Sequence, residues 1–212
     1  MAKPVIILGT QSLGRMALDI FKANNIVVYG FLDDDRKLWG QEINDAPVLG
    51  STTEERYLDL IGKDCEAFVA ITQPTRRQQL VAMLHEQKRV RPINAIHPSA
   101  MIATSATLGH GNLVNAGVIL GIDTILGNDC ILHTRATIEH GTVIKDSVQL
   151  GAASVVGTGA TLHDKVFVGA GATIIAEVEI GPGASIGAGS VVLANVKPGK
   201  TVLGNPAKPI KV

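Results

Sequence analysis

The sequence predicts two units of different fold class: an α/β Rossmann-like unit at residues 1–95 and a parallel β-helix at residues 96–212. Strand and helix patterns alternate in the first segment, whereas aliphatic residues recur every six positions in the second. Aromatic residues make up only 3% of the chain, and all except Phe167 lie before residue 96. The second unit must therefore build its core from small and branched aliphatic side chains, and the chain is long enough for two small domains.

Three short apolar runs in the first segment predict buried parallel strands, because helical patterns lie between them. The first run, PVIILG, leads through the turn TQSLG into a helix with one apolar face. Ser51 and Thr52 are suited to cap a second helix, since their side-chain oxygens can accept hydrogen bonds from its first N–H groups. The expected strands lie at 4–9, 26–32 and 66–71, and the expected helices after residue 11, at 51–61 and at 75–87.

The carboxyl ends of parallel strands form the usual ligand site of such a sheet, and three polar elements are expected to meet there. A glycine turn opens the first helix and suits a phosphate group, although Gln11 replaces the second glycine of the dinucleotide motif G-x-G-x-x-G. Acidic residues follow the second strand, and a threonine and an arginine follow the third. A purely structural turn and an exposed acidic loop remain alternatives. The candidate contacts for a nucleotide-type ligand are Gly9, Ser12, Gly14, Asp33, Asp34, Thr72 and Arg77.

The six-residue period of the second segment matches neither an α-helix nor a simple strand and is typical of hexapeptide β-helices. Every sixth residue from Ile96 to Val192 is Ile, Leu or Val, and each of these anchors is expected to point into a narrow triangular core. Four places after each anchor comes a second inward column of mostly small or β-branched residues. Three hexads close one coil, so residues 18 apart should be neighbours on adjacent coils, with strands about 4.8 Å apart.

Charge and cysteine content exclude several classes of protein. The 19 basic and 19 acidic residues balance, so no nucleic-acid partner is expected. No apolar run approaches the roughly 18 residues of a membrane-spanning helix, so no membrane insertion is expected. Cys65 and Cys130 form neither a metal motif nor a disulfide framework, which favours a cytoplasmic protein.

Histidine is the side chain best suited to base catalysis near neutral pH. His133 and His140 are seven residues apart in LHTRATIEHG and are expected on successive sides of one coil, although a plain surface role remains open for each. A zinc triad is disfavoured: His97 and His133 are suitably spaced, but Ile138 stands where a third histidine would be needed. We therefore expect no bound metal.

The whole chain resembles the bacterial sugar acetyltransferases of the sialic-acid O-acetyltransferase and bacillosamine-pathway N-acetyltransferase type. The matching motifs occur in the family's order and are IILGTQSLGR, GFLDDD, AITQPTRR, INAIHPSA, ATIEHGTVI and VLGNPAKPI. Members of this family join a small nucleotide-sugar-binding α/β domain to a left-handed β-helix that uses acetyl-CoA. They are trimers, with the acetyl-donor site between subunits. The resemblance therefore implies a left-handed β-helix, acetyl-CoA as co-substrate, a nucleotide-linked sugar as partner and a homotrimer.

The resemblance also implies roles for individual residues. His140 in IEHG would be the general base, and His133 occupies a position that touches the substrate. Asp33, Asp34 and Arg77 match residues around the nucleotide. Solenoid glycines and the C-terminal segment are expected beside coenzyme A, namely Gly151, Gly169, Gly187, Gly204, Asn205, Pro206 and Lys208.

Two departures from the family pattern bear on catalysis. The family usually has an acidic residue directly after the catalytic histidine, where this chain has Gly141, and a second histidine where this chain has Gln149. Gln149 can still donate to an acetyl carbonyl but cannot take up a proton. Asp123 precedes Gly141 by one coil, so we expect its carboxylate to reach through the space left by the glycine and bind His140.

The function expected from these observations is N-acetylation of a nucleotide-linked amino sugar by acetyl-CoA, within the biosynthesis of a polysaccharide or glycan. A sugar O-acetyltransferase and a non-catalytic nucleotide-sugar-binding solenoid are the alternatives. An amine with a pKa near neutrality needs less help from a base than a hydroxyl does, which favours N-acetylation in a chain without the acidic partner.

Overall fold

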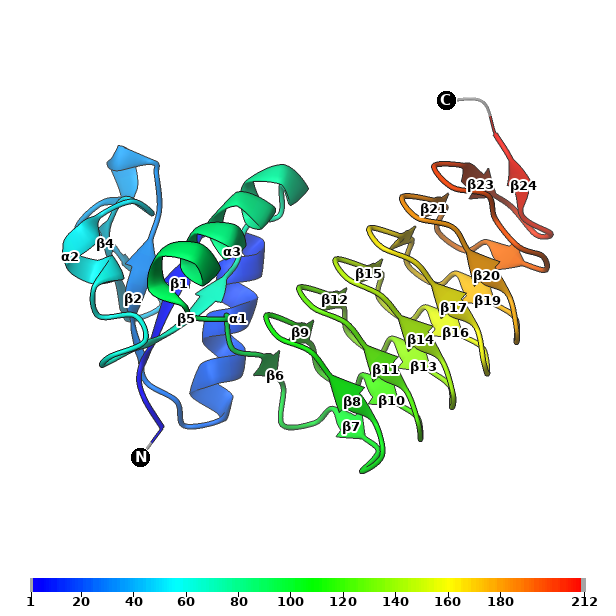
Figure 1. The fold of residues 1–212 in the computed structure, drawn as a ribbon, viewed down its shortest axis with the longest axis horizontal. Helices are drawn as coiled ribbons and strands as arrows, with labels where there is room; N and C mark the ends of the chain where they lie inside the picture. Colours follow the sequence, from blue (N-terminus) through cyan, green and yellow to red (C-terminus); the bar gives the residue numbers. More distant parts are fainter. Residues whose placement is uncertain (1, 211–212) are drawn as a thin grey trace. The chain divides into compact units, whose positions relative to one another are not determined.

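The computed structural model describes residues 2–210 (Figure 1). Contacts within the chain divide it into two compact units, Met1–Pro98 and Ser99–Val212. The first unit is α/β and the second is a parallel β-helix, so the fold class predicted for each part is confirmed. Among the described residues, no helix is both long and apolar enough to cross a membrane.

The first unit is a five-stranded sheet in the order β3-β4-β2-β1-β5. All neighbouring pairs are parallel except β3 and β4, which form a small antiparallel hairpin. Its strands are β1 (Val5–Leu8), β2 (Val28–Leu32), β3 (Glu42–Ile43), β4 (Ala46–Gly50) and β5 (Glu66–Val69). Its helices are α1 (Ser12–Ala23), the 3-10 turn η1 (Arg36–Leu38), α2 (Glu55–Leu58) and α3 (Pro74–Lys88).

Buried phenylalanine side chains form part of the core of this unit. Phe21 of α1 and Phe68 of β5 are buried, and their rings meet edge to face with centroids 5.8 Å apart. Phe31 of β2 is buried as well. Strand β1 is inaccessible along its whole length, as expected for a central parallel strand covered on both faces.

The segment after β2 differs from its prediction. Strands β3 and β4 were not expected, and the helix predicted at 51–61 is reduced to the single turn α2. Ser51 and Thr52 do not cap this helix, because their hydroxyls donate to the carboxylate of Asp34 instead. The cap position belongs to Glu54, whose side chain makes no capping hydrogen bond.

The second unit consists of stacked coils whose short strands form three parallel sheets (Figure 1). Each strand pairs with the strand one coil away, for example Leu120 of β10 with Ile138 of β13. One sheet contains β7 (Met101–Ile102), β10 (Ile119–Leu120), β13 (Thr137–Ile138), β16 (Val155–Val156), β19 (Thr173–Ile174) and β22 (Val191–Val192). Another contains β8 (Thr107–Leu108), β11 (Ile125–Leu126), β14 (Val143–Ile144), β17 (Thr161–Leu162) and β20 (Glu179–Ile180).

The third sheet continues into the C-terminal hairpin. It contains β9 (Leu113–Val114), β12 (Ile131–Leu132), β15 (Gln149–Leu150), β18 (Phe167–Val168), β21 (Ser185–Ile186), β23 (Thr201–Leu203) and β24 (Lys208–Pro209). The strand β6 (Ala95–Ile96) precedes these coils in the chain. Strands β23 and β24 pair antiparallel, whereas the coils pair in parallel.

Both predicted inward columns lie in the core of the β-helix. The anchors from Val114 to Val192 are buried, and so are the small residues of the second column, such as Ala136 and Ala160. The inward Thr124 hydroxyl donates to the Gly121 carbonyl at 2.8 Å, whereas the buried Ser154 hydroxyl has no hydrogen-bond partner among the described residues. Phe167 points outward and is 43% exposed, so the aromatic ring that the narrow core would exclude lies on the surface.

We predict that Gly151→Ala lowers the free energy of unfolding by about 3 kcal/mol, because the new methyl group would overlap the next coil. An ideal Cβ at Gly151 would lie 2.4 Å from the backbone nitrogen of Ala170, which the strand pairing holds in place. Urea unfolding followed by circular dichroism measures the loss.

The matched control is Gly171→Ala, at a corner where an added Cβ would have no neighbour within 4 Å. Its positive φ of 66° should cost only about 1 kcal/mol. Equal losses in the two variants would contradict the packing argument.

Candidate functional site

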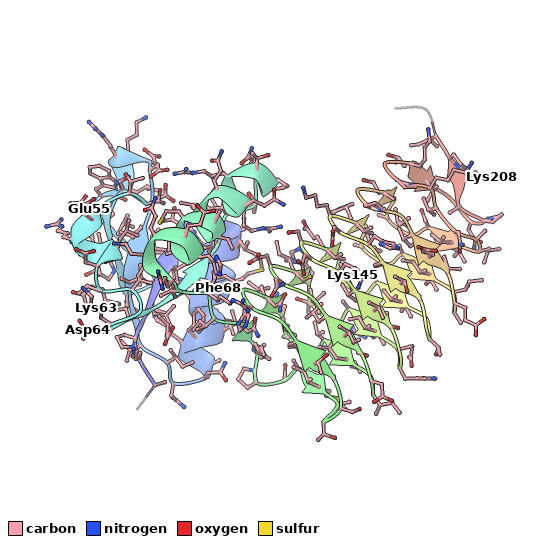
Figure 2. The ribbon with its side chains drawn as sticks, in the orientation of Figure 1. Glu55, Lys63, Asp64, Phe68, Lys145 and Lys208 are labelled. Atoms are coloured by element: carbon pink, nitrogen blue, oxygen red, sulfur yellow. The ribbon has the colours of Figure 1, made fainter. Side chains whose placement is uncertain are left out.

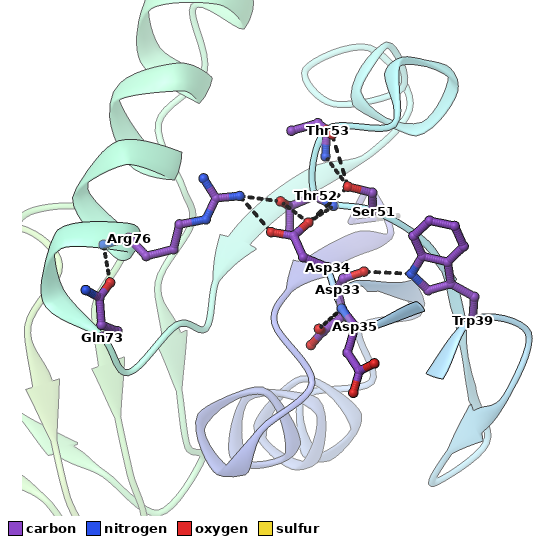
Figure 3. Close-up of polar contacts among 9 residues, drawn as sticks. All are labelled: Asp33, Asp34, Asp35, Trp39, Ser51, Thr52, Thr53, Gln73 and Arg76. Carbon is purple, nitrogen blue, oxygen red and sulfur yellow. Dashed lines mark hydrogen bonds and ion pairs between the residues drawn. The ribbon is translucent and has the colours of Figure 1, made fainter. Parts of the chain in front are cut away.

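A pocket of about 280 Å³ lies where β1, β2 and β5 of the first unit end. This is the strand edge at which a ligand site was predicted. The polar residues converge there from separate loops (Figure 3). The pocket is lined by Gln11, Asp33, Asp34, Thr52, Ile71, Thr72, Gln73 and Arg76.

Asp34 joins three segments at this pocket. One carboxylate oxygen accepts hydrogen bonds from the Ser51 hydroxyl at 2.9 Å, the Thr52 N–H at 3.0 Å and the Thr52 hydroxyl at 2.7 Å. The other accepts from the Arg76 guanidinium at 2.7 Å (Figure 3). Partial burial raises the pKa of Asp34, but the hydrogen bonds from Thr52, Arg76 and Ser51 outweigh it and hold the pKa below its usual value. The carboxylate therefore stays ionised at neutral pH.

Asp33 fixes the turn between β1 and α1. One carboxylate oxygen of Asp33 accepts hydrogen bonds from the Thr10 N–H at 2.9 Å and the Thr10 hydroxyl at 2.6 Å. The other oxygen accepts a hydrogen bond from the Asp35 N–H at 3.0 Å. Both acidic residues thus brace the loops that line the pocket, in addition to facing it.

The glycine turn is built as the sequence suggested. Gly9 has a φ of 111°, a conformation that favours glycine, and a Cβ at Gly14 would lie 2.0 Å from the Gly9 carbonyl oxygen. Ser12 is the first residue of α1 and is exposed. The first N–H groups of α1 receive no side-chain cap from Gln11, so they are suited to an anion.

Arg76, not Arg77, is the arginine of this pocket. Adjacent residues on a helix point about 100° apart, so only one of the pair can face the loops at the end of β2. Arg77 is 5% exposed and lies among the buried residues of α3, whereas Arg76 lines the pocket and bonds to Asp34. The sequence motif QPTRR does not distinguish the two, because the phase of the helix depends on its start at Pro74.

In the second unit, His140 lies at the corner that follows β13 and is exposed. Its Nδ1 atom is 3.4 Å from the hydroxyl oxygen of Thr158, one coil further along the solenoid. This partner was not predicted, although the same stacking rule that relates Asp123 to Gly141 identifies it. The space at Gly141 is open, since a Cβ there would have no neighbour within 4 Å.

The predicted role of Asp123 is wrong. Its backbone lies beneath Gly141 as expected, since the Gly141 N–H donates to the Ile122 carbonyl at 2.9 Å. Within residues 2–210, however, neither a hydrogen bond nor an ion pair joins the Asp123 carboxylate to His140. Asp123 is exposed at a corner with φ of 58°, where its carboxylate keeps its hydration instead of entering the space above it.

His133 and Gln149 form a second polar pair. His133 follows β12, Gln149 begins β15, and the Nε2 atoms of the two side chains are 3.0 Å apart. The amide can only donate through this nitrogen, so the ring accepts at Nε2 and carries its proton on Nδ1. Burial lowers the pKa of His133 below 6.5, which keeps the half-buried ring neutral at pH 7.

The glycines proposed to contact the coenzyme have a packing reason of their own. A Cβ at Gly169 would lie 2.5 Å from the Ala188 nitrogen, and one at Gly187 would lie 2.3 Å from the Leu203 side chain. Gly151 is equally restricted, so these three positions let successive coils approach closely. Their contact with a coenzyme stays a prediction.

The C-terminal candidates lie on the hairpin of β23 and β24. Gly204 has a φ of 103°, its N–H donates to the Ser190 hydroxyl at 3.1 Å, and the Asn205–Pro206 peptide bond is cis. Asn205, Pro206 and Lys208 are exposed, with Lys208 on the surface of the second unit (Figure 2). Across the described part of the chain, no group of three or more His, Cys, Asp or Glu side chains could hold a metal ion.

We predict that His133 makes the protein less stable in mild acid. The folded-state pKa lies below the value of 6.5, so between the two pKa values the unfolded chain binds a proton that the folded chain does not. The free energy of unfolding should therefore fall as the pH drops below about 6.5.

The variant His133→Asn should show a smaller loss of stability than wild type between about pH 7.5 and pH 5.5, in urea unfolding at constant ionic strength. An identical pH dependence in the two proteins would show that His133 titrates normally.

Each of the two units contains a segment that matches a known protein family. The N-terminal domain of PglD matches residues 4–84, and the bacterial transferase hexapeptide of six repeats matches residues 159–194. No curated protein matches the sequence.

Three solved structures align with nearly the whole chain. A histidine-to-alanine mutant of GDP-perosamine N-acetyltransferase from Caulobacter crescentus, in complex with CoA and GDP-perosamine, is 28% identical with a TM-score of 0.89, over 100% of this chain and 99% of that one. The acetyltransferase domain of PglB from Neisseria gonorrhoeae, in complex with acetyl coenzyme A, is 25% identical with a TM-score of 0.89, over 99% and 100%. WeeI from Acinetobacter baumannii, at 23% identity, a TM-score of 0.83 and coverage of 99% and 100%, shares the fold.

These matches cover both units in one continuous alignment, with the α/β domain first and the hexapeptide solenoid second. The left-handed form of the β-helix, which the sequence motifs implied, is confirmed with them. The chain is therefore similar over its whole length to hexapeptide-repeat sugar acetyltransferases, with a PglD-type N-terminal domain and bacterial transferase hexapeptides.

Proposed function

We propose that this protein is an acetyl-CoA-dependent N-acetyltransferase that acts on a nucleotide-linked amino sugar. The observation that carries the proposal is an exposed histidine, His140, whose Nδ1 faces a hydroxyl at a corner of a hexapeptide solenoid. The relative from Caulobacter crescentus, 28% identical along the whole chain, binds CoA and GDP-perosamine. The similarity to this relative and the polar pocket of the first unit support a nucleotide-linked amino sugar as the acetyl acceptor.

The reaction needs one base and one acceptor nitrogen. The amine attacks the thioester carbonyl, the C–N bond forms as the C–S bond breaks, and the sulfur leaves as the thiolate of coenzyme A. His140 takes up the proton that the nitrogen loses, and solenoid N–H groups stabilise the oxyanion. His133 and Gln149 are proposed to contact the reacting groups, with the second N–H of the Gln149 amide available to the acetyl carbonyl.

The nucleotide is proposed to bind in the pocket of the first unit. The N–H groups at the start of α1, which the Gln11 side chain does not cap, and the Arg76 guanidinium provide positive potential for a diphosphate. Asp33, Asp34 and Thr72 supply acceptors for ribose or base, while Gly9, Ser12 and Gly14 shape the turn. The pocket holds both signs of charge, which suits a ligand with phosphates at one end and donors at the other.

Acetyl-CoA is proposed to lie along the solenoid near Gly151, Gly169 and the C-terminal hairpin. A homotrimer would cover apolar side chains that one chain leaves exposed along the first sheet and its corner. These residues are Met101, Ile119, Ile122, Ile175 and Leu193. Cys65 and Cys130 are buried and form no disulfide, which is compatible with a cytoplasmic location.

We predict that His140→Ala lowers kcat by about 100-fold or more, while the KM for both substrates changes little, because the base acts only in the transition state. The assay supplies acetyl-CoA with amino sugars linked to GDP, UDP, dTDP or CMP, and mass spectrometry detects the gain of one acetyl group.

The matched control is His110→Ala, another exposed corner histidine, which should keep wild-type turnover. Unchanged turnover in His140→Ala would discard the base assignment. Acetylation of a sugar hydroxyl in the same assay would favour an O-acetyltransferase, and tight binding of a nucleotide sugar without any product would favour a non-catalytic solenoid.

We also predict that Arg76→Ala weakens binding of the nucleotide-linked sugar about 10-fold or more, since a charged hydrogen bond to phosphate is lost. Gln79→Ala, exposed on the same helix outside the pocket, should bind as wild type does. Isothermal titration at fixed ionic strength measures both. Equal affinities in the two variants would move the nucleotide away from this pocket.

A further inference from the structure

Among residues 2–210, no acidic side chain is bonded to the ring of His140. Within the part of the chain that the structure describes, the His140 ring has no ion pair, and its one side-chain hydrogen bond goes to Thr158. The residue beneath it on the previous coil is Ile122, which has no polar side chain. The adjacent Gly141 supplies no side chain at all. Among the described side chains, the Thr158 hydroxyl is therefore the one hydrogen-bond partner that can select the tautomer of His140.

We propose that Thr158 is the positioning residue of His140: its hydroxyl accepts a hydrogen bond from Nδ1–H and leaves the lone pair on Nε2 free to act as the base. The catalytic role of this hydrogen bond rests on the proposed function, whereas the hydrogen bond itself does not. Without such a partner, the neutral ring can place its proton on Nε2, and that tautomer cannot take a proton from the substrate through the same atom.

The solenoid backbone holds the two residues in register. The Gly159 N–H donates to the His140 carbonyl at 3.1 Å, which fixes the corner of one coil on the corner of the next. Thr158 is β-branched, so its side chain has few rotamers, and it is half-buried. The contact of 3.4 Å is long for a hydrogen bond, as is common for catalytic pairs without substrate, which shorten when the substrate is bound.

The chemical consequence is a base with a neutral partner. A carboxylate would orient the ring and also stabilise the positive imidazolium that forms when the ring takes a proton. A hydroxyl orients the ring without adding negative charge. The site therefore suits an acceptor that needs orientation more than strong deprotonation, namely an amine that is already unprotonated at the working pH, in preference to a hydroxyl.

The open corner at Gly141 makes a gain-of-function test possible. Corners in the same column carry acidic residues at nearly the same backbone angle: Asp123 has a φ of 58° and Glu177 a φ of 61°, against 66° at Gly141. A Cβ at position 141 meets no neighbour within 4 Å, so Gly141→Glu should fold. Its carboxylate would lie next to His140 in sequence, where it can replace the Thr158 hydroxyl as the partner of Nδ1.

The first experiment reads the tautomer of His140 by long-range ¹H–¹⁵N NMR in the absence of substrate, with His140→Gln identifying its signals. Wild type and Thr158→Ser should show the proton mainly on Nδ1, and Thr158→Val should shift the population toward Nε2. The control variant is Thr104→Val. It removes a threonine hydroxyl from the same column of corners, but two coils away from His140, and should leave the spectrum unchanged. An unchanged tautomer in Thr158→Val would overturn the proposal, whether or not the protein is an acetyltransferase.

The second experiment measures acetyl transfer to the amino sugar that wild type accepts. We expect Thr158→Val to lower kcat about 10-fold with KM unchanged, Thr158→Ser and Thr104→Val to stay near wild type, and Gly141→Glu to restore kcat in the Thr158→Val background. Equal kcat in Thr158→Val and wild type would overturn the positioning role. If wild type acetylates no sugar of the panel, the proposed function fails, while the NMR result still decides the His140–Thr158 contact.

Discussion

The hydrogen-bond ladder between successive coils determines which residues of the second unit are stacked on one another. Parallel pairing joins residues one coil apart along the whole solenoid, as in Ile119 with Thr137 and Gln149 with Phe167. A slip of one residue would turn the buried anchors outward, so the register has no alternative. The neighbours of a functional residue on the coils above and below therefore follow from the period alone. For His140 they are Ile122 and Thr158.

The same ladder explains which parts of this site could be predicted from the sequence. Column membership follows from counting, and it placed Asp123 beneath Gly141 correctly; the same rule accounts for the pairing of Phe167 with Gln149. Side-chain direction does not follow from counting, because a corner at positive φ can leave its side chain in solvent, as at Asp123. Thr158 was equally accessible to the counting rule, but a hydroxyl gives a weaker sequence signal for a histidine partner than a carboxylate does.

The structure of the first unit depends more on tertiary contacts than that of the second, so less of it could be predicted from the sequence. The apolar runs predicted β1, β2 and β5, and the polar residues at their ends do converge on one pocket. The strand β4 contains Pro47, which argues against a strand in any pattern based on single residues. Ser51 and Thr52 have good capping chemistry, yet their hydroxyls donate to Asp34, a residue distant in sequence. Local propensity cannot predict that the Asp34 carboxylate competes with the helix N–H groups for these hydroxyls. It also cannot predict which of Arg76 and Arg77 faces the pocket until the start of the helix is known.

The two departures from the family pattern have one electrostatic consequence. Gly141 removes a carboxylate, and the exchange of a histidine for Gln149 leaves an uncharged amide beside His133, whose pKa is lowered by burial. The polar partners that the structure provides for the two ring systems, Thr158 and Gln149, are both uncharged. An imidazolium formed during the reaction gains less stabilisation from neutral partners than from a carboxylate, so the proton must come from a group that gives it up readily. A nitrogen that has already attacked a thioester is strongly acidic, whereas a hydroxyl must lose its proton while it attacks. The uncharged hydrogen-bond partners of the base thus favour an amine over a hydroxyl as the acceptor, independently of what the relatives bind.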